Sequence, residues 1–224
     1  MAPPEPSHAR LPALLFWAFA LVWVALAIAP RYRQDWLLEN LLIVVAVPLL
    51  AWSYRRLRFS NLAYASLFAF LVLHEIGAHY TYAEVPYDRW ARSLAGFSPD
   101  ALLGFSRNHY DRLVHFLYGL LVTPAAFELI AARSAPATRF WRWLLPLSFV
   151  ASHAVLFELV EWAAALAFAG ELGEAYLGTQ GDPWDAQSDM FLAVAGSAIT
   201  ASVLAWRASA PVQVPMTSIS PDRA

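Results

Sequence analysis

The stretch LFELVEWAAALAF, residues 156–168, places two carboxylates, Glu158 and Glu161, three residues apart in a run that is otherwise almost entirely apolar. It forms the end of a longer apolar segment, 140–168, that is long enough to cross a membrane as a helix. One ionised carboxylate in the middle of such a helix costs about 2.5–3.5 kcal/mol on insertion scales. We therefore expect both glutamates to face a polar pocket rather than lipid.

The composition of the whole chain also predicts a membrane protein. Of its 224 residues, 59% are hydrophobic and 14% are charged, and the mean hydropathy is +0.47, which is too apolar for an ordinary soluble domain. A transmembrane helix needs about 20 mainly apolar residues. We predict an all-α, polytopic fold with about six transmembrane helices in one bundle, at residues 11–30, 36–54, 61–82, 111–132, 140–168 and 186–206.

The ends of the chain predict tails rather than further domains. Residues 1–10 and 208–224 are rich in Pro and Ser and have no apolar periodicity, so we expect disordered cytoplasmic tails on either side of a transmembrane domain at 11–207. The first span is not expected to be a cleaved signal, because Pro30 directly follows its small-residue site. The chain has no cysteine, which excludes disulfides and thiolate metal ligands.

The arginines predict the orientation of the spans. All 15 basic residues are arginine, and nine of them fall on the side of the two tails against six on the other side. The strongest cluster, YRRLR at 54–58, lies in a very short loop, where the positive-inside rule has most weight. We expect both termini to be cytoplasmic. The loop at 83–110 is then outside, and its YDRWARSLAGF segment predicts a short interfacial helix.

Ionisable side chains gather toward the outer ends of four predicted spans, as the direction of each span shows. An ionisable residue inside a span is by default a candidate for function. Several pairs lie three or four residues apart and so share a helix face, among them Asp111 with His115 and Glu158 with Glu161. In the last span we expect Asp182 to be the N-cap and Pro183 the first helical residue.

Acids and histidines on one face can bind a divalent cation or transfer protons. The candidate cofactor is a divalent cation. The candidate catalytic residues are His115, Asp111, Glu158 and Glu161; the candidate metal ligands are Glu158, Asp189 and His115; the candidate ligand-binding residues are His74, Glu75, His79, Tyr82, His109, Asp185 and Gln187.

Three segments carry a resemblance to known families. DRLVHF, FELVEW and DPWDAQSDMFLAVAG resemble, in this order, the motifs D-[KR]-x-x-H-F, E-x-x-[QE] and D-x-x-x-N-x-x-G of VanZ-like membrane proteins. With HEIGAHYTY added, the chain is more closely similar to the YjdF-like family of bacterial inner-membrane proteins, over roughly residues 70–200. Glu161 and Ala193 depart from the VanZ-like pattern, which has Gln and Asn there. The positions that match are Asp111, His115, Glu158, Asp189 and Gly196.

The resemblance implies a multi-pass protein of the bacterial inner membrane and supplies no reaction. Two function classes stay open. The first is a metal-assisted enzyme that acts on a lipid-linked envelope substrate at the outer leaflet. The second is a non-catalytic binder or transporter of a proton, a cation or an envelope ligand. In both, the expected partners are the lipid bilayer and a lipid-linked ligand, not nucleic acid, and Asp111, His115, Glu158 and Asp189 are expected to share one ligand.

Overall fold

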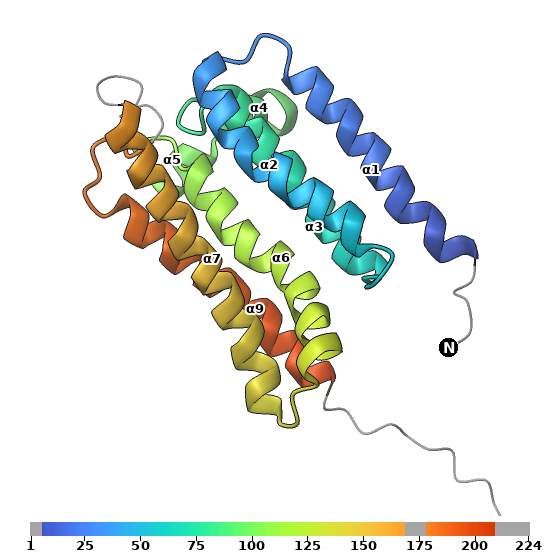
Figure 1. Cartoon of the computed structure of the whole chain (residues 1–224). Helices are drawn as coiled ribbons and strands as arrows, with labels where there is room; N and C mark the ends of the chain where they lie inside the picture. The colour runs from blue at the N-terminus through green and yellow to red at the C-terminus, as the bar shows by residue number, and fades with distance from the viewer. Residues whose placement is uncertain (1–5, 169–177, 209–224) are drawn as a thin grey trace, which may run out of the picture.

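The computed structural model of the chain describes residues 6–168 and 178–208, and the elements in these ranges are all helices (Figure 1). Apolar runs separated by Pro, Gly and polar residues fold into one helix each, as the hydropathy pattern predicts. The helices are α1 (Pro6–Leu26), α2 (Arg33–Ser53), α3 (Asn61–Tyr80), α4 (Tyr87–Ala95), α5 (Pro99–Leu103), α6 (Tyr110–Ser134), α7 (Arg139–Phe168) and α9 (Asp185–Arg207).

Five of these helices, α2, α3, α6, α7 and α9, are long and apolar enough to cross a membrane. The all-α polytopic fold predicted from the sequence is therefore confirmed. In α1 the apolar helix over the described side chains, Arg10–Leu26, is shorter, and α1 as a sixth span stays a prediction. The helix begins at Pro6, inside the predicted tail. The rest of that tail, residues 1–5, lies outside the described residues, as do residues 169–177 and 209–224.

Helices α6, α7 and α9 pack against one another, and α3 joins this group through α6 (Figure 1). Helices α1 and α2 both pack on α3. In Figure 1 the loops that lead into α2, α4 and α6 lie at one end of the bundle, and the α2–α3 and α6–α7 loops lie at the other end. The arginine cluster at 55–58 is therefore at the opposite end of the bundle from α4 and α5.

The closest helix contact is between α6 and α9, and two glycines make it possible. A Cβ atom on Gly119 would lie 1.9 Å from the backbone oxygen of Ala193, and one on Gly196 would lie 2.1 Å from the backbone oxygen of Phe116. Small residues at helix interfaces allow this approach in membranes, where packing replaces the hydrophobic driving force. One turn further along, the Thr123 hydroxyl donates a hydrogen bond to the Ser197 hydroxyl at 2.7 Å, which ties the two helices together.

The Gly196→Ala substitution tests this contact. The added methyl group would meet backbone of α6, which cannot rotate away, so α6 and α9 must move apart. Overpacking of this kind costs roughly 1–3 kcal/mol, and we expect a lower melting temperature in detergent. The control is Val203→Ile, which also adds one carbon to α9, at an exposed side chain. Equal melting temperatures for the two variants would contradict the close approach.

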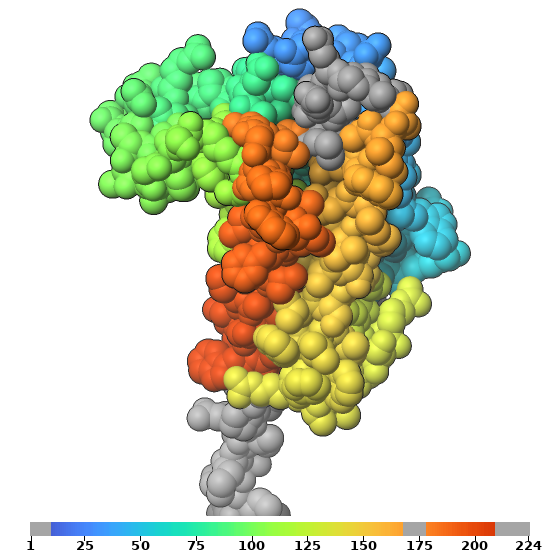
Figure 2. Space-filling model, turned by 90° about the vertical axis from the view of Figure 1, so that its left-hand side faces the viewer, coloured from blue at the N-terminus to red at the C-terminus, as the bar shows by residue number. Residues whose placement is uncertain are grey.

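The loop at 83–110 folds into α4 and α5, which project sideways from the end of the bundle (Figure 2). This agrees with a short helix in the 83–110 loop. The hairpin keeps apolar side chains on its surface, since Leu94 is 88% exposed and Leu102 is 75% exposed. A helix with a charged face and an apolar face lies in the membrane interface. We expect α4 and α5 to rest on the headgroup layer beside the bundle.

Candidate functional site

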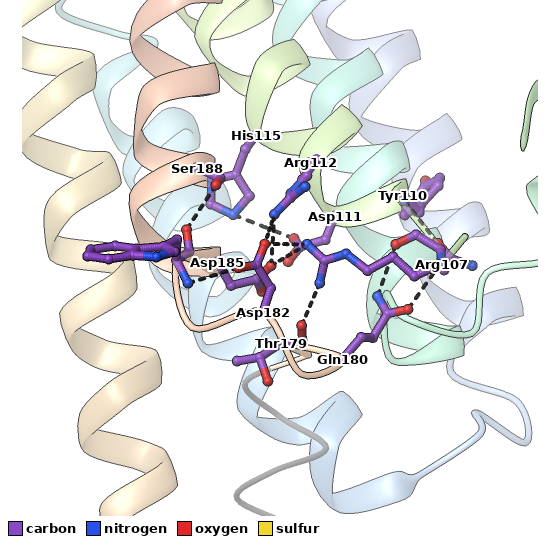
Figure 3. Close-up of polar contacts among 12 residues, drawn as sticks. Arg107, Tyr110, Asp111, Arg112, His115, Thr179, Gln180, Asp182, Asp185 and Ser188 are labelled. Atoms are coloured by element: carbon purple, nitrogen blue, oxygen red, sulfur yellow. Dashed lines mark hydrogen bonds and ion pairs between the residues drawn. The ribbon is translucent and has the colours of Figure 1, made fainter. Parts of the chain in front are cut away.

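Two arginines and two aspartates form a charged clamp at the end of the bundle near α5 (Figure 3). The Arg107 guanidinium lies 3.0 Å from the Asp182 carboxylate and 2.9 Å from the Asp185 carboxylate, and it also donates a hydrogen bond to the Thr179 carbonyl. Arg112, on α6, pairs with the same two carboxylates. The clamp fixes the segment before α9 onto the start of α6.

The structure corrects the predicted start of the last span. Helix α9 begins at Asp185, and its N-cap residue is Trp184 rather than Asp182. The Asp182 carboxylate instead accepts a hydrogen bond from the Trp184 backbone N–H at 2.9 Å. This hydrogen bond, together with the hydrogen bond and charge of Arg112 and the charge of Arg107, holds the pKa of Asp182 below its ordinary value. The sequence showed the acid but not the two arginines that bind it.

Deeper in the bundle than the clamp, four side chains from three helices meet. The Nε2 atom of His115 lies 3.5 Å from Oδ1 of Asp111 and 3.6 Å from Oε1 of Glu158. Asp189, from α9, joins this group, because ligand atoms of Asp111, His115 and Asp189 lie within 4.8 Å of one another. Helices α6, α7 and α9 thus deliver the four residues that the sequence predicted to share one ligand. We call this group the α6–α7–α9 cluster.

The spacing in this cluster suits a cation better than direct hydrogen bonds. Both distances from His115 Nε2 are at or beyond the limit of a hydrogen bond. Two ligand atoms that each lie about 2.1 Å from a tetrahedral metal are about 3.4 Å apart. In the described part of the chain, Oε1 of Glu158 and Oδ1 of Asp189 are buried without a hydrogen-bond partner. A cation bound by Asp111, His115 and Asp189 would compensate the Asp189 carboxylate, and Oε1 of Glu158 lies beside the same imidazole nitrogen.

Glu161 lies one helical turn from Glu158 and is buried, whereas Glu158 is partly buried. An ionised Glu161 would be repelled by the negative charges of Asp111, Glu158 and Glu39, which lie close to it. Like charges at such depth need a proton or a cation between them. Glu158 faces His115 inside the bundle, as the sequence predicted for a polar neighbour, and Glu161 is also close enough to Glu39 of α2 for their charges to interact.

Helix α2 adds acids that the sequence interpretation missed. Asp35, just before the predicted span at 36–54, lies in the first turn of α2 and is buried. Glu39 of α2 and the predicted candidate Glu75 of α3 are buried close to it. Both carboxylate oxygens of Asp35 and of Glu75 have no hydrogen-bond partner among the described residues. The available signal was the spacing of Asp35 and Glu39, four residues apart at the start of a span. We call Asp35, Glu39 and Glu75 the α2–α3 acids.

His74 is a fixed part of this second region. Its Nε2–H donates to the backbone oxygen of Glu39 at 3.1 Å, and its Nδ1 accepts from the Tyr82 hydroxyl at 2.5 Å. Thr81 and Tyr82 both have positive φ, which folds Tyr82 back over Gly77 after α3 ends. Burial, followed by the charge of Glu39, raises the pKa of Tyr82 well above its ordinary value, so this hydroxyl stays a donor. Both ring nitrogens of His74 are therefore engaged.

Three of the sequence candidates lie away from both the α6–α7–α9 cluster and the α2–α3 acids. His79 bonds the backbone oxygen of Leu26 at 2.8 Å and so links α3 to the end of α1. His109 precedes α6 and stacks on Phe105, and its partial burial, with the charges of Arg112 and Arg107, lowers its pKa. Gln187 is exposed on α9. Asp185 lies closer to the cluster, but its carboxylate is paired with the two arginines of the clamp.

Arg107→Gln tests the clamp. The change removes the charge that is shared by Asp182 and Asp185, and a partner lost from a partly buried ion pair leaves uncompensated charge. We expect earlier proteolysis at the segment before α9 and a melting temperature several degrees lower at neutral pH. Arg89→Gln, an exposed arginine on α4, is the control. An unchanged melting temperature in Arg107→Gln would show that the clamp does not stabilise the fold.

Comparison with known proteins shows the family to which the chain belongs. Residues 11–210 match the family described as "Predicted membrane protein (DUF2238)". The chain belongs to this family and is a multi-pass membrane protein. It is 35% identical over 185 residues to the inner membrane protein YjdF of Escherichia coli (strain K12), which covers 83% of this chain and 84% of that protein. The YjdF-like resemblance is thus confirmed, and with it an inner-membrane location. No solved structure matches the chain.

Proposed function

We propose that the protein is a membrane-embedded enzyme that uses a divalent cation, held by the α6–α7–α9 cluster, on a lipid-linked substrate of the cell envelope. The observation that carries the proposal is the position of His115 Nε2, 3.5 Å from Asp111 and 3.6 Å from Glu158, in a buried group with Asp189. One imidazole with three carboxylates is a donor set that suits Zn²⁺ or Mn²⁺. The chain has no thiolate to compete.

The residues around the cation have distinct chemical roles in this proposal. A divalent cation polarises a phosphoryl or carbonyl oxygen and stabilises the negative charge that develops on it. Glu161, one turn from Glu158 on α7, lies beside the cluster and is placed to accept or return a proton. The clamp of Arg107 and Arg112 keeps Asp185 out of the ligand set by neutralising it.

A second function, uptake of protons or cations without chemistry, is supported by the α2–α3 acids. Together with the cluster and Glu161 they add up to seven buried or largely buried carboxylates, more than one divalent cation neutralises. The far half of the bundle gives little support for transport. Between α6 and α9 its described polar groups, Thr123 and Ser197, bond to each other in a tight helix contact, and Glu128 accepts hydrogen bonds from Ser60.

Metal analysis of the full-length protein tests the site. In detergent-purified wild type we expect about one equivalent of Zn²⁺ or Mn²⁺, and Asp111→Asn and Glu158→Gln should each lose most of it. The double variant should be no worse than either single variant, because ligands of one cation are not independent. Glu128→Gln, an acid at the other end of the bundle, should keep its metal. Metal that is absent from wild type even after incubation with either ion would overturn the metal site.

We also propose that both termini are cytoplasmic, so that α4, α5 and the site face the outer leaflet. The chain has no cysteine, so single cysteines can be labelled without background. In intact cells, Ser106→Cys should react with a membrane-impermeant maleimide, and Ala137→Cys should react only after permeabilisation. The reverse pattern would invert the topology and place the site at the inner leaflet.

A further inference from the structure

A groove runs along the bundle beside the α2–α3 acids. It has a volume of about 330 Å³ and lies between α2 and α7, with α3 and α6 as its floor. Pockets of 300–1,000 Å³ with apolar walls and a few convergent polar groups are typical binding sites for small molecules. The walls are mainly leucine, valine and phenylalanine side chains. The polar groups include Glu39, His74, Tyr82 and His115, and Tyr118 and His153 also line the groove.

The groove differs in its polar groups from a larger hollow elsewhere in the described structure. That hollow lies between α1, α2 and α3, has a volume of about 450 Å³ and is lined by apolar and aromatic side chains, with no acid and no histidine. An apolar lining of this kind is sufficient for contact with bulk lipid tails. The groove between α2 and α7 combines an apolar channel with a carboxylate, which bulk lipid tails do not require.

The rim of the groove faces the bilayer. Val45 on α2 and Leu156 on α7 line the groove and are more than half exposed. Both residues lie on helices that are long and apolar enough to span the membrane. Their exposed surface therefore meets hydrocarbon rather than water. A molecule that enters from this side must come from the bilayer and must have an apolar chain.

The polar end of the groove selects for positive charge. Glu39 is 3% exposed, and its Oε2 atom has no hydrogen-bond partner among the described residues. Asp35, Asp111 and Glu75 are acids close enough to Glu39 to add to any negative charge there. A headgroup that carries an ammonium group would compensate this charge directly, whereas a headgroup that carries only a phosphate would be repelled unless a cation lay between them.

We propose that the groove binds a membrane lipid with an amine-bearing headgroup, with one hydrocarbon chain between α2 and α7 and the ammonium group beside Glu39. The inference rests on the proposed function and deepens it by naming the class of substrate. The headgroup then lies next to His115, which lines the same groove and belongs to the α6–α7–α9 cluster. Entry is lateral, so the substrate does not leave the bilayer.

The experiment uses full-length protein in nanodiscs that contain a photoactivatable lipid, with the reactive group in the acyl chain and either a phosphoethanolamine or a phosphoglycerol headgroup. Crosslinked peptides are identified by mass spectrometry. In wild type we expect crosslinks to concentrate on the groove segments of α2 and α7 and to be about tenfold stronger for the phosphoethanolamine lipid. Crosslinks spread evenly over the exposed helix surfaces, or equal labelling by the two lipids, would overturn the proposal.

Substitutions at Val45 and Glu39 test binding of the lipid's hydrocarbon chain and of its headgroup separately. Val45→Trp should fill the groove and reduce its crosslinks about tenfold, whereas Val44→Trp, the neighbouring residue that does not line the groove, should leave them unchanged. Glu39→Gln should keep the crosslinks and lose the headgroup preference. Equal effects of the two tryptophans would contradict chain binding, and a preference that survives Glu39→Gln would contradict the role of Glu39.

Metal content is measured on the same samples, after size-exclusion chromatography has shown that each variant is folded. Val45→Trp should retain its metal, since Val45 is not part of the cluster. If wild type has no metal but shows the groove crosslinks, the metal-assisted reaction fails and lipid binding stands. If wild type has metal and lacks the groove crosslinks, the lipid proposal fails and the metal site stands.

Discussion

The structure depends on one constraint, which is that carboxylates buried within a membrane must be compensated. An isolated ionised carboxylate in a medium of low dielectric constant is far less stable than in water. Asp189 and Glu75 are 1% and 0% exposed, and their oxygens include atoms without a hydrogen-bond partner among the described residues. No single helix could carry such groups alone. The helices must meet where their charged residues lie, and the compensating charge must come from a proton, a cation or the headgroup of a lipid.

The rest of the bundle is arranged to hold that meeting point in place. The glycines of α6 and α9 bring these two helices within backbone contact, one turn from His115 and two turns from Asp189. At the end of the bundle, Arg107 and Arg112 neutralise two further acids and fix the segment before α9. The turn at Thr81 and Tyr82 directs a hydroxyl back onto His74. Each device holds a charged or polar side chain in place inside the bundle or at its end.

Hydropathy was sufficient to predict the fold and much of the cluster. Span direction and helical spacing predicted that Asp111, His115, Glu158 and Asp189 lie at one end of the bundle, because both follow from the geometry of a straight helix. The same rules did not single out Asp35 or Glu39. The predicted span began at 36 and left Asp35 in a loop, and Glu39, inside that span, was not chosen as a candidate. These rules also could not predict that His74 lies beside the α2–α3 acids whereas His79 bonds the end of α1. That difference depends on a backbone turn and on which neighbour accepts the hydrogen bond, and neither is visible in spacing.

The central claim, a cation bound by imidazole and carboxylates from three helices, is tested most directly by X-ray absorption spectroscopy of the zinc-loaded protein. The account predicts a first shell of one nitrogen and about three oxygen ligands at about 2.0–2.2 Å, with the imidazole contribution lost in His115→Gln. The same contribution should be retained in His74→Gln, because both ring nitrogens of His74 already have partners. A spectrum with oxygen ligands alone, or one that is unchanged in His115→Gln, would contradict it.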